Sequence, residues 1–364
     1  MKSYFRITLV VAGMAFASPS LAQEAIVPCT FLPSTGVTPD ATMAALDKLY
    51  ELGDIRVFYS TTDVTHQLPV ISRPDRNSNG VPDFVENVAK QVSVARKIFN
   101  LAGFRDPLES PRYRIVSKID VNILNLPSYN GLAYDGAIRY TNLPLRGNAC
   151  TLRIDINRNL QSTSENFTTS WFVPAHEMFH LFQYGSTLYK NSMMAEPTAR
   201  WSEYALRPNS EYQAIPPTVT PLPASRADLC TIINTPVSAP GYLMYTRLIE
   251  LTDPRNELRI PASSISSETY VDGKAVIKDG LWRGSQIMSY LLQSLDAEDD
   301  AHSFETLREY HRWPEADQKS PTNIPRILHA IERTIDRMAI TGAEVDKFKS
   351  AVAAYQANQD CSIP

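Results

Sequence analysis

The sequence has no excess of basic residues and, after its first residues, no long hydrophobic run. Lys and Arg total 35 against 39 Asp and Glu, for a net charge of −4. Neutralising a phosphate backbone requires a basic excess, so this balance disfavours nucleic acid as a partner. Nothing after residue 22 approaches eighteen consecutive apolar residues, which excludes a multi-span membrane protein and predicts no transmembrane segment in the mature chain. With 43% apolar residues and 14 Gly in 364 residues, disorder and collagen are excluded as well, and an ordinary globular protein is indicated.

The first 22 residues have the pattern of a secretory signal peptide. Lys2 and Arg6 precede the apolar stretch Ile7–Phe16, and the small residues of Ser20–Ala22 suit signal-peptidase cleavage. Gln23 stands where a lipoprotein would have Cys. We therefore expect an exported protein, secreted or periplasmic; an uncleaved N-terminal anchor is the alternative.

Cysteine is scarce, and its four copies are widely spaced. An oxidising compartment favours two disulfides, for which three pairings are possible, and the spacing is too scattered for a metal knuckle. Four buried free thiols are the alternative, because a chain of this length can build its core without cross-links. The four positions are Cys29, Cys150, Cys230 and Cys361.

Residues 75–86 match the calcium-binding loop of an EF-hand. Oxygen-bearing side chains occupy loop positions 1, 3, 5, 9 and 12, and Gly80 at position 6 allows the sharp turn. Calcium takes six to eight oxygen ligands, and this spacing wraps the chain around one ion. The alternative is a solvated turn that binds nothing. The candidate ligands are Asp75, Asn77, Asn79, the carbonyl of Val81, Asp83 and Glu86.

Two neighbouring features define this loop further. Pro82 lacks the backbone N–H that paired EF-hands use for a short two-stranded contact, so we expect a single, unpaired loop. Residues 84–102 have a helical period and precede Gly103, which predicts a helix directly after the loop. The expected calcium is structural, and extracellular sites of this kind bind with a Kd of about 10⁻⁴ to 10⁻³ M.

Residues 176–180 read H-E-x-x-H. On a helix, His176 and His180 share a face and can reach one Zn²⁺, while Glu177 is directed at the water that zinc holds. Pro174 suits the first turn of such a helix, and Gly185 suits a cap at its C-terminus. The motif therefore predicts a zinc-binding helix with Glu177 as general base.

A catalytic zinc needs a third protein ligand. A metzincin would have Gly at 183 and His at 186, and Gln183 and Ser186 exclude that subclass. Glu196, just before Pro197 at the start of an expected helix, is the preferred ligand. Glu203, two turns further along the same face, is a competing ligand or a partner that holds an imidazole. The alternative is a pair of core histidines with two unrelated surface glutamates.

Three segments together resemble a family of secreted bacterial zinc metalloproteases. They are N-G-V-P-D-F-V-E at 79–86, A-H-E-M-F-H-L-F-Q at 175–183 and E-P-T-A-R-W-S-E at 196–203, in the family's order, over about residues 75 to 206. The family pairs N-G-x-P-D-x-V-E with A-H-E-x-F-H-x-x-Q and E-x-x-A-x-W-x-E, and Pro197 replaces the usual small residue. The resemblance implies a gluzincin-like zincin, with zinc on His176, His180 and Glu196.

The remaining pattern predicts an α+β, zincin-like fold: a small sheet, the metal-binding helix and a helical C-terminal part. Residues 207–240 hold seven prolines and predict a loop or extended cover rather than a helix. His302, His311 and His329 receive no catalytic role. The expected regions are 1–22 (signal peptide), 23–110 (N-terminal region with the calcium loop) and 111–364 (catalytic region). Strands are predicted at 55–60, 114–126 and 151–157, and C-terminal helices at 281–295, 303–313, 324–338 and 344–357.

We therefore predict an exported, calcium-stabilised zinc endopeptidase that acts on peptide or protein substrates. Two alternatives remain open. One is a non-catalytic, metal-stabilised periplasmic or surface binding protein. The other is a zinc amidase acting on a non-protein substrate, because the metal chemistry would be the same.

Overall fold

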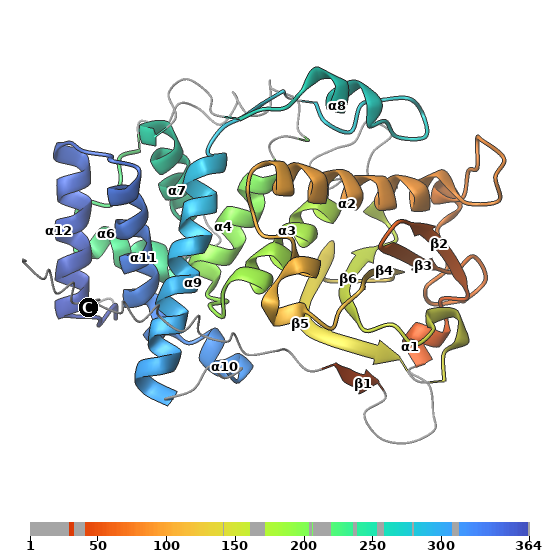
Figure 1. The fold of residues 1–364 in the computed structure, drawn as a ribbon, viewed down its shortest axis with the longest axis horizontal. Coiled ribbons are helices and arrows are strands. Elements are labelled where there is room, and N and C mark those ends of the chain that lie inside the picture. Colours follow the sequence, from red (N-terminus) through yellow and green to blue (C-terminus); the bar gives the residue numbers. More distant parts are fainter. Residues whose placement is uncertain are drawn as a thin grey trace, which may run out of the picture.

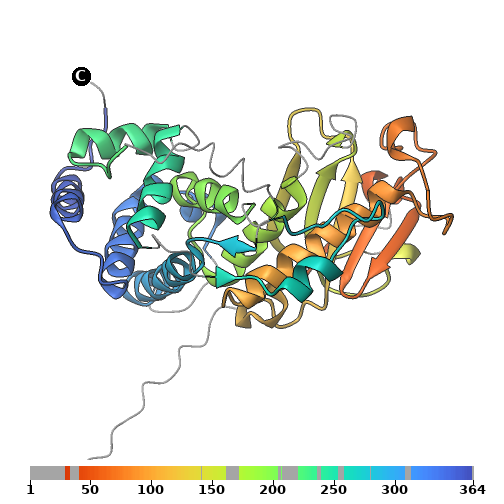
Figure 2. The ribbon, with the colours of Figure 1, turned by 90° about the horizontal axis from the view of Figure 1, so that it is seen from above.

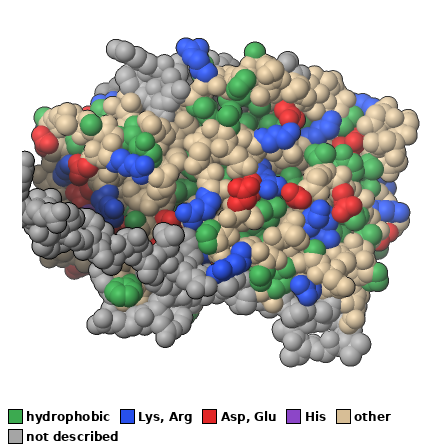
Figure 3. Space-filling view, in the orientation of Figure 1, with side chains coloured by type: hydrophobic (Ala, Val, Ile, Leu, Met, Phe, Trp, Pro, Cys, Tyr) green, Lys and Arg blue, Asp and Glu red, His purple; other side chains and the backbone are tan. Residues whose placement is uncertain are grey.

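The computed structural model describes residues 29–32, 41–140, 142–160, 172–203, 206, 220–235, 239–252, 258–278, 280–307 and 313–362. The expected signal peptide lies outside these residues, as do 207–219 and 236–238 of the proline-rich stretch. Among the helices described, none combines the length and apolar character required to span a bilayer. Acidic and basic side chains are interspersed over the face of the molecule in Figure 3.

The described residues include one mixed sheet of six strands. These are β1 (Thr30–Leu32), β2 (Lys48–Leu52), β3 (Ile55–Tyr59), β4 (Lys118–Leu124), β5 (Gly131–Tyr140) and β6 (Thr151–Asn157), in the spatial order β1-β5-β6-β4-β3-β2. β3, β4 and β6 are parallel, whereas β5 is antiparallel to β6 and β2 to β3. β1 pairs only with Ile138–Tyr140 at the end of β5.

The predicted strands are confirmed, but two strands were not predicted. β3, β4 and β6 lie within the segments whose apolar and polar residues alternate. β5 was missed because it carries two glycines and a register shift between Tyr134 and Ile138, which interrupt that alternation. β2 was missed too.

Helix α2 (Asp83–Leu101) lies across one face of the sheet (Figure 1). Its apolar side chains, such as Val88 and Val92, are fully buried there. Gly103 follows with φ of +83°, a left-handed conformation that glycine adopts without strain. The helix predicted after the calcium loop is therefore confirmed.

The opposite face of the sheet carries a buried polar network. Arg56 donates to both carboxylate oxygens of Asp120, at 2.7 and 3.0 Å, and Asn122 donates to Asp155 at 2.8 Å. Arg146 links these two pairs, because it lies 3.4 Å from Asp120 and donates to Asn122 at 2.8 Å. Hydrogen bonds between charged groups keep such burial tolerable, and here they join β3, β4 and β6 side to side.

The metal-binding motif lies on helix α3 (Val173–Ser186), beside helix α4 (Ser192–Ser202). The prediction that α4 begins near Glu196 was wrong, because the helix starts four residues earlier. Asn191 caps it by accepting a hydrogen bond from Met193 N at 3.0 Å, so Pro197 lies inside the helix.

The C-terminal part is helical, and most of its helices lie at the far end of the molecule from the sheet, with α3 and α4 between them (Figures 1 and 2). Helix α8 (Ala262–Ser267) is the exception, because it lies over α2 (Figure 1). Among the described residues the C-terminal part comprises α6 (Arg226–Asn234), α7 (Ala239–Thr252), α8, α9 (Ser285–Leu307), α10 (Glu315–Gln318), α11 (Ile324–Arg337) and α12 (Ala343–Ala357), with a hairpin of β7 (Leu258–Arg259) and β8 (Leu281–Trp282).

Two predictions for this part need correction. The helix expected at 281–295 and the start of the one expected at 303–313 form a single helix, α9, since no Pro or Gly separates them. It begins at Ser285 rather than Leu281, and residues 308–312 lie outside the described residues. Residues 207–240 are not wholly extended: α6 fits between Pro223 and Pro236, and Ser225 caps it. The predicted helices at 324–338 and 344–357 correspond to α11 and α12 and are confirmed.

The four cysteines form two disulfides, as expected. Cys29 pairs with Cys150 and ties the start of β1 to the residue before β6; Cys230 pairs with Cys361 and ties α6 to the chain after α12. No free cysteine remains among the described residues, so the free-thiol alternative was wrong.

Candidate metal centre

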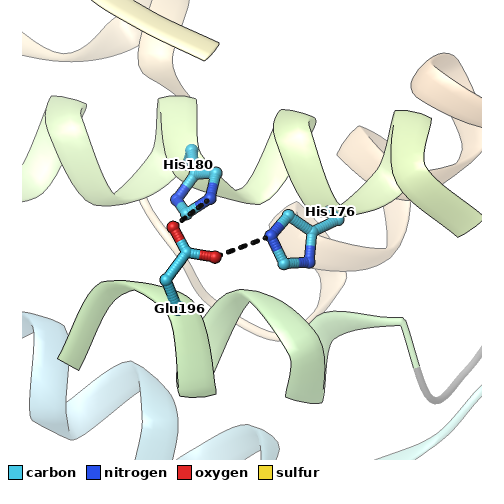
Figure 4. Close-up of side chains that lie close together, drawn as sticks. All are labelled: His176, His180 and Glu196. Atoms are coloured by element: carbon cyan, nitrogen blue, oxygen red, sulfur yellow. Dashed lines mark ion pairs between the residues drawn. The ribbon is translucent and has the colours of Figure 1, made fainter. Parts of the chain in front are cut away.

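Two histidines and one glutamate converge between α3 and α4 (Figure 4). The imidazoles of His176 and His180, one turn apart on α3, have ring centroids 4.9 Å apart. Glu196 reaches across from α4: its Oε2 lies 3.4 Å from His176 Nε2 and its Oε1 lies 3.6 Å from His180 Nε2. One ligand atom from each residue lies within 4.8 Å of the others, so the three can hold one metal ion.

The other ring nitrogens of both histidines have acceptors. Glu203 Oε1 lies 3.0 Å from His176 Nδ1, and Gln183 Oε1 lies 2.7 Å from His180 Nδ1. Gln183 is itself oriented, because its amide donates to Ala195 O at 2.9 Å and to Thr198 Oγ1 at 2.6 Å. A neutral imidazole that donates from Nδ1 presents a lone pair at Nε2. Both Nε2 atoms face Glu196, so the residues present fit a divalent metal.

Gln183 was not predicted as a partner of the centre. It served only to exclude the metzincin motif, although its place three residues after His180 puts it on the same side of a helix. The expectation for Gly185 also needs correction. α3 continues through Ser186, and Gly185 lies inside it, where a Cβ would be 3.4 Å from Pro107 Cα and Ser110 donates to the Gly185 carbonyl at 2.6 Å.

An aromatic cluster behind the ligands fixes the angle between the two helices. Trp201 of α4 stacks on Trp282 with ring centroids 4.5 Å apart and meets Phe179 of α3 at 5.7 Å. Phe99 of α2 packs edge-on against Phe179 at 5.1 Å. Burial of these large rings stabilises the pair of helices strongly, so the ligand geometry rests on a rigid core.

The pKa values of the two histidines depend on each other and on the neighbouring carboxylates. Burial alone would lower the pKa of His176, but hydrogen bonds to Glu196 and Glu203 raise it to about 10. Burial lowers the pKa of His180, and the charge of His176 lowers it further. The two carboxylates therefore favour protonation of His176, whereas burial favours the neutral form of His180.

Glu177 points away from its neighbours on the helix and toward β5. Burial raises the pKa of Glu177 to about 7, and the charges of Glu196 and Glu203 act in the same direction against that of His176. Gly131 at the start of β5 makes room for it: a Cβ there would lie 2.6 Å from Glu177 Oε1 and 2.5 Å from Val173 Cγ1. Only glycine fits this position without displacing the carboxylate.

The loop at 75–86 folds back on the start of α2. Asp75 accepts from Asn79 N at 3.1 Å and from Gly80 N at 2.8 Å, and Glu86 accepts from the amides of Asn77 at 2.9 Å and Asn79 at 3.0 Å. Four of the predicted calcium-ligating side chains, Asp75, Asn77, Asn79 and Glu86, are thus connected to one another.

Asp83, also predicted as a calcium ligand, is directed elsewhere. Its Oδ1 accepts from Arg76 N at 3.0 Å and its Oδ2 lies 3.7 Å from Arg76 Nε. Asp75, Asp83 and Glu86 do not form a group of carboxylates within 4.8 Å among the described residues. Position 9 of such loops often acts through water, so an indirect role of Asp83 remains compatible with the loop pattern.

A second group with metal-like spacing, Asp296, Asp299 and Asp300 on α9, was not predicted. Its carboxylates already have protein partners. Asp299 accepts from Thr187 Oγ1 at 2.5 Å and Leu188 N at 2.6 Å, and Asp296 lies 3.5 Å from Arg105. This cluster is explained by its own hydrogen bonds and ion pair.

No protein-family model matches this chain. No curated protein matches it. No solved structure matches it either. The functional argument therefore depends on this chain's own residues and their geometry.

Proposed function

We propose that this protein is an exported, zinc-dependent endopeptidase. The observation that carries the proposal is the convergence of His176, His180 and Glu196, with each histidine's Nδ1 next to an acceptor. Two imidazoles and one carboxylate, with room left for water, are the ligands of a catalytic rather than a structural zinc site. The three motifs also resemble those of secreted bacterial zinc metalloproteases. This resemblance implies a gluzincin-like zincin and so supports the same function.

A bound zinc ion would lower the pKa of a water molecule toward 7 and polarise the scissile carbonyl. Glu177 would accept a proton from that water as it attacks the carbonyl carbon, and would then deliver the proton to the leaving nitrogen. Its burial and a pKa near neutrality suit both steps, because the carboxyl must take up and release a proton in one cycle.

The edge of β5 supports a peptide as substrate. β1 covers only Ile138–Tyr140, and no other described strand pairs with Gly131–Ala137 on that side. This part of β5 runs beside α3 and begins next to Glu177. An extended substrate chain can add to such an edge through main-chain hydrogen bonds, which would place its scissile bond beside Glu177.

Two further properties belong to the proposal. Calcium in the loop at 75–86 would be structural, since it would fix the chain just before α2 and lie apart from the histidines. Export is supported by the two disulfides and by the signal-peptide pattern of the first 22 residues. Extracellular calcium concentrations match the weak affinity of a single loop of this kind.

The test is metal content by elemental analysis together with hydrolysis of casein, with and without a zinc chelator. We expect Glu177→Gln to keep zinc and lose hydrolysis by about 10²-fold or more, because it removes the proton acceptor alone. His176→Ala should lose both zinc and activity. Hydrolysis by Glu177→Gln at the wild-type rate would reject the mechanism, and a zinc-loaded wild-type chain that cleaves no peptide library would favour the binding-protein alternative.

A further inference from the structure

Tyr184 lies one helical turn beyond His180 on α3. Side chains of a helix lean toward its N-terminus, so the Tyr184 ring is directed back over His180. The two rings stack with centroids 5.8 Å apart and an angle of 9° between their planes.

Other contacts hold the Tyr184 ring in place without using its hydroxyl group. Lys190 Nζ lies 5.1 Å from the ring centroid, and Asp135 of β5 fixes Lys190 through an ion pair of 2.5 Å. No hydrogen bond joins the Tyr184 hydroxyl to another described residue. Two other tyrosines nearby differ in this respect: Tyr113 donates to Asp135 O at 2.9 Å and Tyr134 donates to Asp155 at 3.0 Å.

The proposed reaction needs a hydrogen-bond donor at this place. When water adds to the scissile carbonyl, the carbonyl π electrons move to oxygen and create an oxyanion. A donor that is already positioned beside that oxygen stabilises the transition state more than the ground state. Glu177 is occupied with proton transfer, and His176 and His180 are occupied as metal ligands.

We propose that Tyr184 is a catalytic residue, whose phenol donates a hydrogen bond to the oxyanion of the tetrahedral intermediate. This inference rests on the proposed peptidase function. The phenol keeps its proton throughout: Glu177 carries the proton of the attacking water to the nitrogen as the carbon–nitrogen bond breaks, and the oxyanion electrons return to form the product carboxyl. No oxidant or further reactant is required.

The other candidate donors are placed elsewhere. His302 packs edge-on against Trp313 at 5.0 Å, and His329 lies 2.9 Å from Glu298, so both belong to the C-terminal helices. His311 lies outside the described residues. Lys190 is neutralised by Asp135.

The experiment is a steady-state comparison of Tyr184→Phe with the wild type, using the zinc-loaded full chain. The substitution keeps the ring and its stack on His180 and removes only the hydroxyl. We expect kcat to fall by about 10² to 10³-fold, with KM within about threefold and zinc content unchanged. A phosphonate peptide, which mimics the tetrahedral state, should bind weaker by the same factor as kcat/KM falls.

The matched control is Tyr245→Phe, which removes a buried hydroxyl without a hydrogen-bond partner from α7 in the C-terminal part. It should keep both kcat and phosphonate affinity. A Tyr184→Phe variant with wild-type kcat would overturn the inference, and so would a loss of activity that only follows loss of zinc. A wild-type chain that holds zinc but cleaves nothing would refute the proposed function first, and this inference with it.

Discussion

At the scale of single residues, the candidate metal centre depends on side chains other than its three candidate ligands. Glu203 and Gln183 each accept from an imidazole Nδ1, and they thereby determine which nitrogen of each histidine carries the lone pair. Gln183 in turn is held by Thr198 and by the carbonyl of Ala195 on α4. The ligand orientation is thus set by hydrogen bonds that cross between the two helices.

Gln183→Leu tests this orientation. The substitution keeps the approximate volume but removes the acceptor of His180 Nδ1, and we expect zinc affinity to fall by about 10 to 100-fold. Competition with a chromophoric chelator measures the affinity. Gln293→Leu, on the exposed side of α9, is the control and should leave the zinc affinity unchanged. Equal zinc affinity of Gln183→Leu and the wild type would contradict the role.

At the scale of elements, the sequence predicted best those helices and strands whose apolar residues recur with a clear helical or strand period. α2, α11, α12, β3 and β6 follow directly from apolar periodicity, and H-E-x-x-H placed two ligands on one helix. β5 could not be predicted in this way, because Gly131 and Gly136 interrupt its alternation, and Gly131 is present to make room for Glu177. The start of α4 was misjudged because Pro197 was taken as a first-turn residue.

The partners of the centre show the same limit of sequence reasoning. Glu203 could be named from helical spacing relative to Glu196, and spacing also puts Gln183 and Tyr184 beside His180. The groups that hold these two side chains in place depend on packing: Ala195 and Thr198 of α4 hold Gln183, and Lys190 lies against the Tyr184 ring. Spacing along one helix gives which residues share a face. It does not give which of them meets a neighbour from another element.

The predicted calcium loop, which directly precedes α2, leads to a prediction for the thermal stability of the protein. An ion bound there only in the folded state stabilises by RT ln(1 + [L]/Kd), or about 1.4 to 2.7 kcal/mol at about 10 mM calcium for the expected affinity. We expect the melting temperature to rise by several degrees with calcium. In Asp75→Asn this calcium-dependent rise should shrink or vanish, because a charged ligand is lost.

Asp63→Asn is the matched control for the calcium loop. Asp63 accepts from Thr65 N at 2.9 Å and His66 N at 2.6 Å in the preceding turn, but it lies outside the predicted ligand set. The melting temperature of Asp63→Asn should rise with calcium by as much as that of the wild type. Identical melting curves of the wild type with and without millimolar calcium would remove the basis for a calcium site.

At the scale of the whole molecule, a buried carboxyl connects the end of α3 to the C-terminal helices. Asp299 of α9 accepts from Thr187 and Leu188, which directly follow α3. Burial raises the pKa of Asp299 well above its ordinary value, although Arg112 acts in the opposite direction. The folded state therefore binds this proton more tightly than the unfolded chain does.

A pH dependence of stability follows from Asp299. Because its folded pKa is raised, its contribution to the free energy of unfolding declines as pH rises from about 4 through the folded pKa. Asp299→Asn cannot titrate, so its stability relative to the wild type should increase from about pH 4 to about pH 8 in urea titrations. Asp336→Asn, at an exposed position, should show no such trend, and a constant difference for Asp299→Asn would contradict the prediction.

The three ligands and both imidazole acceptors all come from residues 176–203. A contiguous stretch of chain needs little loss of entropy to bring its own groups together. The candidate ligand set is therefore completed within one helical hairpin, without a contribution from a distant described segment. A chelator would act on that hairpin alone, whereas Phe99 and Trp282 would continue to hold its two helices at their angle.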